Sequence, residues 1–337
     1  MSRKPLPIGK LDSEILQKIV FDNITYRRPE VTTRPGIGED CAVIDFGAYD
    51  CVISSDPITA AVADIGRLSI HISCNDIASN GIEPLGIMLV ILLPVGTTED
   101  DIQHIMSQSS EAAAQCGVEI IGGHTEITAA VNTPVIVSTA LGRGLKGQSQ
   151  NTHNMQEGDL IYMTKTAGIE GTGIIACDFE QEVSSFLSPD EIQKAKDLLD
   201  QVSVVKEGVI AGRIGTTGMH DITEGGVLGA VWELCNVSGL GAEIIAADIP
   251  VEEVTKKISA HFSVDYLRLI SSGCMLMVMP PSKREALETA MAEANIRLSC
   301  IGRITKAEHG ITLLQDGQAL PVLPPAADEI YRVVGRE

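Results

Sequence analysis

The sequence predicts a two-domain α/β protein with mixed sheets flanked by helices. Its 337 residues are the usual length of two domains. Apolar runs typical of strands alternate with amphipathic segments typical of helices along the whole chain. A polar stretch rich in Gly, Gln and Asn, residues 142–158, interrupts this alternation. We therefore expect an N-terminal domain over residues 1–150 and a C-terminal domain over residues 151–337.

The charge balance limits the possible partners. Forty-five acidic and 25 basic residues give a formal net charge of −20. Such a field repels phosphate backbones and anionic lipid surfaces, so we expect neither a nucleic-acid nor a membrane partner. A nucleotide remains possible if bound Mg²⁺ inverts the local charge at clustered carboxylates.

The cysteines and the apolar runs indicate a cytoplasmic protein. Eight cysteines include no C-x-x-C pair, and several lie in apolar runs, as reduced core residues do. The first ten residues contain no apolar segment of a signal peptide. The longest apolar run, residues 85–95, is about half of the length that a membrane span needs.

The N-terminal domain is expected to contain three helices and five strands. A short helix over residues 12–20 precedes a loop over residues 26–38. Asp56-Pro57 ends the second strand of a hairpin, and Gly81 ends the following helix. Thr98 begins the next helix, which Gly117 ends. The expected strands cover residues 41–46, 51–55, 85–95, 118–121 and 135–141.

The C-terminal domain shows the same alternation. The expected strands cover residues 160–164, 243–246, 274–279, 298–304 and 311–314. The expected helices cover residues 168–179, 189–199, 204–214, 251–261 and 282–295, and one more begins at residues 221–226. Residues 326–337 form either a last helix or a frayed tail.

Two aspartates frame the central helix. Asp56 lies where the chain leaves a strand, and Asp76 lies near the end of the helix that follows. One strand-loop-helix unit can bring these carboxylates within a few ångströms, which is how an oxygen-ligand metal site is built. Glu39 and Asp40, between glycines and a strand, are either turn residues or further ligands. Asp221 is either a ligand or a helix N-cap.

Five blocks of sequence carry a resemblance to a known family. They are DPITAAVADIGRLSIHISCNDIASNGIEP, GIGEDCAV, GGHTEI, DITEGGVLGAV and SSGCMLMV. In order and spacing they resemble the aminoimidazole-ribonucleotide (AIR) synthetase superfamily, with the hydrogenase-maturation branch HypE as the nearest. The resemblance covers residues from about 8 to about 305.

The resemblance implies an Mg-ATP site, and it assigns roles residue by residue. Asp40, Asp56, Asp76 and Asp221 match the family's Mg-ATP aspartates, and Asn75 matches an asparagine beside the phosphates. Lys10 corresponds to a mobile segment that closes over ATP, or it is a solvated tail lysine. The expected nucleotide-binding residues are Lys10, Gly38, Glu39, Asn75, Gly122, Gly123 and Thr125. The expected catalytic residues are His124 and Asp221. The expected metal ligands are the four aspartates and Glu126.

Two departures from the nearest branch limit the analogy. This chain has Gly-Gly-His-Thr at residues 122–125 where that branch has Gly-Gly-Asp-Thr. Imidazole suits softer metals than Mg²⁺. Either Glu126 supplies the oxygen, or the site holds one metal fewer, or His124 contacts a phosphate or the substrate. HypE also ends in a carrier cysteine, whereas the last cysteine here is Cys300.

Other motifs point to weaker alternatives. No P-loop pattern is present, and the G-x-G-x-x-G at residues 142–147 is followed by a polar stretch instead of an apolar helix. His71 and Cys74 could suggest thiol catalysis, but helical periodicity favours a packing role for Cys74.

The functional expectation is an ATP-dependent enzyme. It would activate an amide- or carbonyl-type oxygen by phosphoryl transfer, on a small-molecule or protein-borne substrate, and the resemblance to HypE implies hydrogenase maturation as its setting. The alternatives are a non-catalytic ATP-binding assembly factor and a metallohydrolase that uses His124 with the aspartates. We also expect a homodimer, because the strands at residues 85–95 and 135–141 are apolar on both faces and need cover on both.

Overall fold

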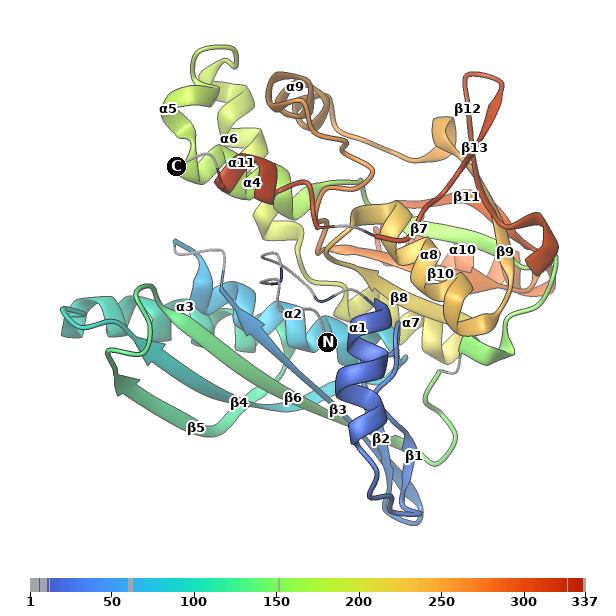
Figure 1. Ribbon diagram of the computed structural model, residues 1–337, viewed down its shortest axis with the longest axis horizontal. Coiled ribbons are helices and arrows are strands. Elements are labelled where there is room, and N and C mark those ends of the chain that lie inside the picture. The colour runs from blue at the N-terminus through green and yellow to red at the C-terminus, as the bar shows by residue number, and fades with distance from the viewer. Residues whose placement is uncertain are drawn as a thin grey trace.

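The computed structural model describes residues 6, 11, 13–59, 63–150, 152–325 and 327–335. It contains two mixed sheets flanked by helices, which confirms the α/β class (Figure 1). One sheet is built from residues 31–145, so its last strand runs into the polar stretch at 142–158, and the other is built from residues 160–321. Lys10 lies outside the described residues.

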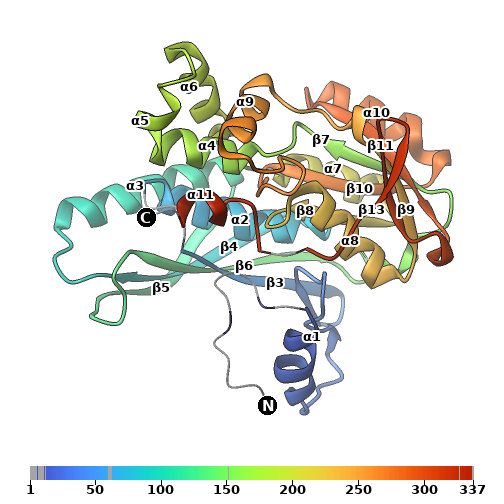
Figure 2. The same ribbon diagram turned by 45° about the horizontal axis from the view of Figure 1, so that its top comes forward.

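The N-terminal sheet has the strand order β1-β2-β3-β6-β4-β5. Only β4 and β5 pair in parallel; the other neighbours are antiparallel. The strands are β1 Val31–Thr33, β2 Ala42–Asp45, β3 Tyr49–Ile58, β4 Pro84–Leu93, β5 Glu119–Ile127 and β6 Val135–Leu145. Helices α2, Ile65–Ser79, and α3, Glu99–Cys116, cover one face of this sheet (Figure 2).

Local signals explain where these two helices begin and end. Thr98 and Asp101 form a reciprocal capping box at the start of α3, and Gly117 ends it in the left-handed conformation. Gly81 follows α2 with a φ of +74°. These are the boundaries that the sequence predicts.

The C-terminal sheet has the order β13-β12-β9-β11-β7-β10-β8, with only β12 and β9 parallel. Its strands are β7 Leu160–Thr164, β8 Gly218–Ile222, β9 Gly241–Ile245, β10 Cys274–Met279, β11 Leu298–Thr305, β12 Ile311–Gln315 and β13 Gln318–Pro321. Its helices are α4 Ile169–Asp178, α5 Glu180–Val183, α6 Pro189–Asp197, α7 Val205–Ile214, α8 Gly226–Ser238, α9 Glu253–Phe262, α10 Arg284–Glu293 and α11 Tyr331–Val334.

The two domains pack tightly along α2, which is buried on nearly every side. Helix α7 of the C-terminal domain lies directly against it. A Cβ atom on Gly208 would lie 2.4 Å from the carbonyl oxygen of Ala78, so only glycine permits this approach. The central helix is therefore a shared core element of both domains.

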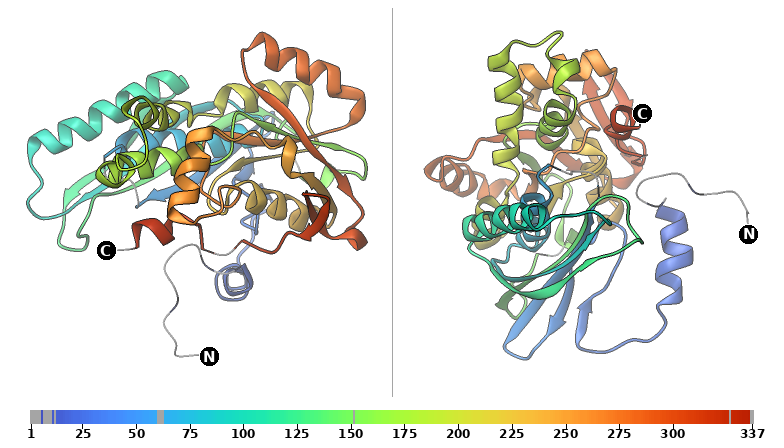
Figure 3. Two further views of the ribbon diagram at one scale, coloured as in Figure 1. Left: turned by 90° about the horizontal axis from the view of Figure 1, so that it is seen from above. Right: turned by 90° about the vertical axis from the view of Figure 1, so that its left-hand side faces the viewer.

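A helical segment near the N-terminus stands apart from both sheets (Figure 3). It consists of α1 Ser13–Ile15, the π-helical η1 Leu16–Val20 and the 3₁₀ turn η2 Phe21–Asn23. None of its residues is buried. Its position agrees with the predicted helix over residues 12–20. In the described part of the chain, no helix is long and apolar enough to cross a membrane.

Several predicted boundaries were wrong. Strand β3 continues through Pro57. Strand β2 pairs with β3 only as far as Ile53, so one side of β3 has no neighbouring strand beyond that residue. The N–H that Pro57 lacks would point to this free side, so its absence costs no hydrogen bond. Strand β5 extends to Ile127, so Gly-Gly-His-Thr lies within an edge strand instead of a turn. Strands β1, β8 and β13 were not predicted. Asp221 lies in β8, so Asp221 is not a helix cap.

Candidate functional site

Four aspartates meet where the two domains join. Asp40 precedes β2, Asp56 lies in β3, Asp76 lies in α2, and Asp221 lies in β8 of the other domain. Asp40, Asp56 and Asp221 each lie close enough to Asp76 to raise its pKa. The four residues that the resemblance assigns to Mg-ATP are thus brought together from segments up to 181 residues apart in the sequence, from position 40 to position 221.

A serine hydroxyl lies between two of these carboxylates. Ser54 Oγ is 2.6 Å from Asp76 Oδ2 and 3.2 Å from Asp56 Oδ2. A hydroxyl has one proton, so it can donate to only one of the two acceptors. The remaining carboxylate oxygens need either a proton or a cation.

Burial makes the negative charge of this cluster costly. The pKa of Asp76 is raised well above its usual range by burial first, and then by the charges of Asp221, Asp56 and Asp40. Burial is also the largest cause that raises the pKa of Asp40 to about 7. A divalent cation would remove the repulsion between these groups and permit all of them to ionise.

Asp221 provides the clearest sign of a cation site. Its side chain is 1% exposed, and neither carboxylate oxygen has a hydrogen-bond partner among the described residues. Buried carboxylates are almost always paired, hydrogen-bonded or bound to a metal. The carboxylates of Asp40, Asp56 and Asp76 beside it supply hard oxygens, the donor type that Mg²⁺ prefers. The residues present therefore fit Mg²⁺.

A buried histidine, which the sequence analysis missed, lies beside the aspartates. His220 Nδ1 is 2.7 Å from the carbonyl oxygen of Asp221, so it must be the donor, and it lies 3.4 Å from Asp40 Oδ2. Nε2 is 3.0 Å from Glu233 Oε2. Burial alone would lower the pKa of His220, but Asp40, Asp221 and Glu233 together raise it well above its usual value. Among the described residues, Asp40, His220 and Asp221 place one ligand atom each within 4.8 Å of one another.

The strand position of His220 could not have revealed it. It precedes Asp221 in β8, and adjacent strand residues normally point to opposite faces. The sequence gives no sign that Glu233, on α8, reaches its ring.

Asn75 has a different environment from the one the resemblance implies. Its Nδ2 donates to the carbonyl oxygen of Val202 over 2.8 Å, and its Oδ1 accepts from the N–H of Val204, also over 2.8 Å. The side chain is completely buried. Both ends of the amide are thus bonded to a loop of the other domain, so Asn75 joins the domains in this structure instead of facing an open phosphate site.

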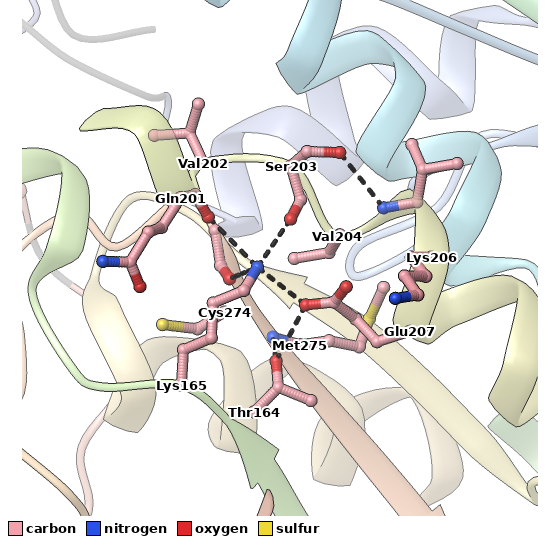
Figure 4. A network of polar contacts seen from close by, with 12 residues as sticks. Thr164, Lys165, Gln201, Val202, Ser203, Val204, Lys206, Glu207, Cys274 and Met275 are labelled. Atoms are coloured by element: carbon pink, nitrogen blue, oxygen red, sulfur yellow. Dashed lines mark hydrogen bonds and ion pairs between the residues drawn. The ribbon is translucent and has the colours of Figure 1, made fainter. Parts of the chain in front are cut away.

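The same loop is also held by a partly buried lysine (Figure 4). Lys165 Nζ donates to the carbonyl oxygens of Gln201, Ser203 and Gly273 over 3.1, 2.6 and 2.8 Å. It also forms a 2.7 Å ion pair with Glu207, whose side chain is 3% exposed. Loop 201–204 is therefore fixed between Asn75 and Lys165, and it sets the position of α2 relative to the C-terminal domain.

The loop before Asp40 packs against α8. Gly38 has a φ of +77°, and a Cβ there would lie 2.7 Å from Cγ2 of Val237. Only glycine allows the loop to approach the helix this closely. Burial raises the pKa of Glu39, the next residue. Gly38 and Glu39 therefore border the aspartate cluster through their neighbour Asp40.

The Gly-Gly-His-Thr segment lies elsewhere. His124 shares a cross-strand row with Val90, Val137 and Pro57, so it lies three strands, roughly 14 Å, from β3. The same register places it on the face of the sheet opposite to α2. Its Nε2 is 3.1 Å from Glu126 Oε2, and both side chains are about half exposed. Within one chain, residues Gly122, Gly123, His124, Thr125 and Glu126 do not join the aspartates.

Comparisons with known proteins agree with this architecture. The putative hydrogenase expression/formation protein MJ0676 of Methanocaldococcus jannaschii is 26% identical and aligns over 96% of this chain and 97% of its own length. Carbamoyl dehydratase HypE of Cupriavidus necator is 27% identical over 84% of this chain and 79% of its own. The crystal structure of hydrogenase maturation protein HypE in complex with ATP superposes with a TM-score of 0.68 at 18% identity, over 96% of this chain and 97% of that chain.

Family models describe both halves of the chain. The model of the N-terminal domain of AIR synthase related proteins matches residues 38–144, and that of the C-terminal domain matches residues 156–314. The first spans the segments that carry Asp40, Asp56 and Asp76, and the second spans the segment that carries Asp221. The chain therefore belongs to the AIR synthase related protein family.

Proposed function

We propose that this protein binds Mg-ATP at the aspartate cluster and uses it to activate an amide- or carbonyl-type oxygen by phosphoryl transfer. The observation that carries the proposal is the convergence of four carboxylates from both domains around Asp221. Neither buried oxygen of Asp221 accepts a hydrogen bond from the described residues, and Oδ1 lies 3.8 Å from His220 Nδ1. Four carboxylates at close range repel one another as anions, and the single imidazolium of His220 cannot neutralise all of them, so the cluster favours a divalent cation.

The chain's own residues would hold and orient the metal ion that neutralises the nucleotide phosphates. Asp40, Asp56, Asp76 and Asp221 would hold Mg²⁺, which supplies charge neutralisation at the nucleotide phosphates. Ser54 orients the Asp76 carboxylate, and Ser79 Oγ lies 3.0 Å from Asp40 Oδ2 and orients that group. Phosphoryl transfer depends mainly on such positioning and electrostatic stabilisation, so no protein nucleophile is required.

The relatives indicate the biological setting. A relative that aligns over 96% of this chain and 97% of its own length carries the name of a hydrogenase expression/formation protein, and others are carbamoyl dehydratases. A protein of the same fold has been solved with ATP. We infer a role in hydrogenase maturation, in the cytoplasm, on a small-molecule or protein-borne substrate; eight free thiols are consistent with a reducing compartment.

Calorimetry tests the site. A non-hydrolysable ATP analogue should bind the wild-type protein with Mg²⁺ and much more weakly with EDTA. Asp221→Asn retains the side-chain shape but removes the charge, so it should weaken binding roughly tenfold or more in the presence of Mg²⁺. Equal affinity with Mg²⁺ and with EDTA would refute the metal-nucleotide site.

Product analysis separates an enzyme from an assembly factor. ADP formation should rise when an acceptor with an amide or carbamoyl oxygen is added to the protein and Mg-ATP. Tight binding without ADP formation across a panel of such acceptors would favour the non-catalytic assembly factor. For the metallohydrolase alternative, the separation of His124 from the aspartates within one chain offers no support.

We further propose a homodimer through the open face of the N-terminal sheet. Along β4, Ile87, Leu89 and Ile91 are buried under the helices, whereas Leu85 and Met88 on the other face are 55% and 45% exposed. Exposed apolar strand faces of this kind favour a partner. His124 and Glu126 lie on the same open face, so a second copy would bury them at the interface.

A further inference from the structure

The C-terminal segment, residues 322–325 and 327–335, packs against two loops beside the aspartate cluster. It returns from β13 toward the loop at the end of β8 and finishes in α11 (Figure 1). One of the two loops covers residues 223–226 and follows Asp221 in the chain. The other covers residues 265–273 and leads into β10.

Asp328 joins the C-terminal segment to both loops. Its side chain is 2% exposed. Its Oδ2 accepts the N–H of Gly225 over 2.6 Å, and its Oδ1 accepts the N–H groups of Ile270 over 3.2 Å and of Ile330 over 2.8 Å. Hydrogen bonds to a carboxylate are roughly twice as strong as those between neutral groups. Asp328 therefore fixes the loop after Asp221 relative to the loop before β10.

The loop after β8 needs such contacts to keep its shape. Gly225 and Gly226 have φ angles of +86° and +60°. Glycine reaches many other conformations at no steric cost, so two consecutive glycines do not select this turn by themselves. Two further contacts come from the C-terminal segment. The Tyr331 hydroxyl donates to Glu224 Oε1 over 2.9 Å, and a Cβ at Gly225 would lie 3.1 Å from Cβ of Pro325.

The position of the Asp221 carboxylate depends on this turn. Strand β8 lies at the edge of its sheet, where Asp221 pairs with Met275 of β10. Neither carboxylate oxygen of Asp221 accepts a hydrogen bond from the described residues. The backbone therefore sets where the carboxylate lies, and the turn over residues 223–226 begins two residues after Asp221.

We propose that Asp328 is a positioning residue of the metal site. By holding the turn over residues 223–226, it keeps the Asp221 carboxylate where the other three aspartates meet it. Tyr331 adds to this effect through Glu224. Both oxygens of Asp328 are already bonded to backbone N–H groups, so Asp328 does not itself bind the metal. The inference rests on the proposed Mg-ATP site.

Two variants remove these contacts separately. In Asp328→Asn an NH₂ group replaces one acceptor oxygen, so the side chain loses either the bond to Gly225 or those to Ile270 and Ile330. Tyr331→Phe loses only the bond to Glu224. Leu323→Ala, which shortens a side chain that is 63% exposed on the same segment, is the control.

Calorimetry of the full-length protein with a non-hydrolysable ATP analogue at graded Mg²⁺ concentrations measures the effect. The Mg²⁺ concentration for half-maximal binding should rise roughly fivefold or more in Asp328→Asn, less in Tyr331→Phe and not at all in Leu323→Ala. In the metal-free protein, amide hydrogen exchange at Gly225 should be faster in Asp328→Asn than in the wild type. Urea unfolding shows whether each variant is folded.

The outcomes separate this inference from the proposed function. If the wild type binds the analogue equally with Mg²⁺ and with EDTA, the proposed function fails, and the inference fails with it. If the wild type needs Mg²⁺ and folded Asp328→Asn has the same Mg²⁺ requirement, only the inference fails. A lower urea midpoint with that unchanged requirement would show a purely structural role for Asp328. If Asp328→Asn does not fold, an unchanged Mg²⁺ requirement in Tyr331→Phe overturns the inference.

Discussion

The hydroxyl oxygen of Ser54 lies 2.6 Å from Oδ2 of Asp76 and thereby joins strand β3 to helix α2 at the aspartate cluster. The main chain at Asp76 is held as well, since its carbonyl oxygen lies 2.7 Å from Ser79 Oγ and 3.1 Å from Cys41 Sγ. Asp76 is therefore held through both its side chain and its main chain, so its position is set before any cation binds.

Asp76→Asn should weaken Mg-ATP binding at least tenfold, which is about 1.4 kcal/mol, because one charged ligand is lost from a multidentate site. In the metal-free protein at neutral pH the same change should raise the free energy of unfolding, because the raised pKa makes folded Asp76 keep a proton that the unfolded chain has lost, and asparagine has no such cost. Calorimetry and urea denaturation measure the two effects. Asp100→Asn, at an exposed position on α3, is the matched control, and an equal loss of affinity in both variants would contradict the assignment.

Asn75→Ala should destabilise the protein by about 2–4 kcal/mol. The carbonyl of Val202 and the N–H of Val204 would both lose their partner in a buried site, and each unpaired group costs about 1–3 kcal/mol. Urea denaturation checks the loss. Asn236→Ala, on the exposed face of α8, should change the stability little. A near-neutral Asn75→Ala would show that the loop is not anchored by this amide.

Lys165→Met should also be strongly destabilising, by about 3–5 kcal/mol, because it leaves Glu207 buried without its cation. The double variant Lys165→Met, Glu207→Gln should recover part of that loss, since no unpaired charge remains. Thermal and chemical unfolding of the two single variants and the double variant form a complete cycle. If the double variant is no more stable than Lys165→Met alone, the ion pair is not the source of the effect.

Glu170→Gln should stabilise the protein above neutral pH. Burial is the main cause that raises the pKa of Glu170 to about 7 in the folded chain, and its Oε2 accepts the N–H of Ser272 over 3.3 Å. The folded state therefore keeps a proton that the unfolded state has already lost, so wild-type stability is complete below the unfolded pKa and falls as the pH rises through about 7.

Glutamine cannot ionise, so the advantage of Glu170→Gln should grow between pH 5 and pH 7 to at most about 3 kcal/mol and then level off. Urea unfolding across this pH range measures it. Glu157→Gln, at an exposed site, serves as the control. A stability difference that does not change with pH would show that the carboxyl group of Glu170 is not the source.

Met88→Lys should convert a dimer into a monomer without loss of stability in each chain. The residue is 45% exposed in the single chain, and a lysine there would lie unpaired in an apolar interface. Sedimentation velocity at micromolar concentration reports the mass. Leu320→Lys alters a residue of similar exposure, 40%, on strand β13 of the other domain and should leave the mass unchanged. A wild-type monomer would refute the interface.

Short-range features of the sequence determined much of this fold. The helical period of apolar residues and the capping residues Thr98, Gly81 and Gly117 placed α2 and α3 correctly, because helix ends depend on contacts within a few residues. Aspartates at the ends of adjacent elements likewise indicated a shared site. Extended pairing was less predictable, since β5 and β8 are strands only because a neighbouring strand lies beside them.

Only the tertiary structure decided the remaining features of the site. It placed His220 and Glu233 beside Asp40, and it turned Asn75 toward a loop 127 residues further along the chain. It also separated His124 from the aspartates by three strands. These relationships depend on strand order and on how closely α7 packs against α2, and both are set by long-range packing, about which local residue patterns carry no information.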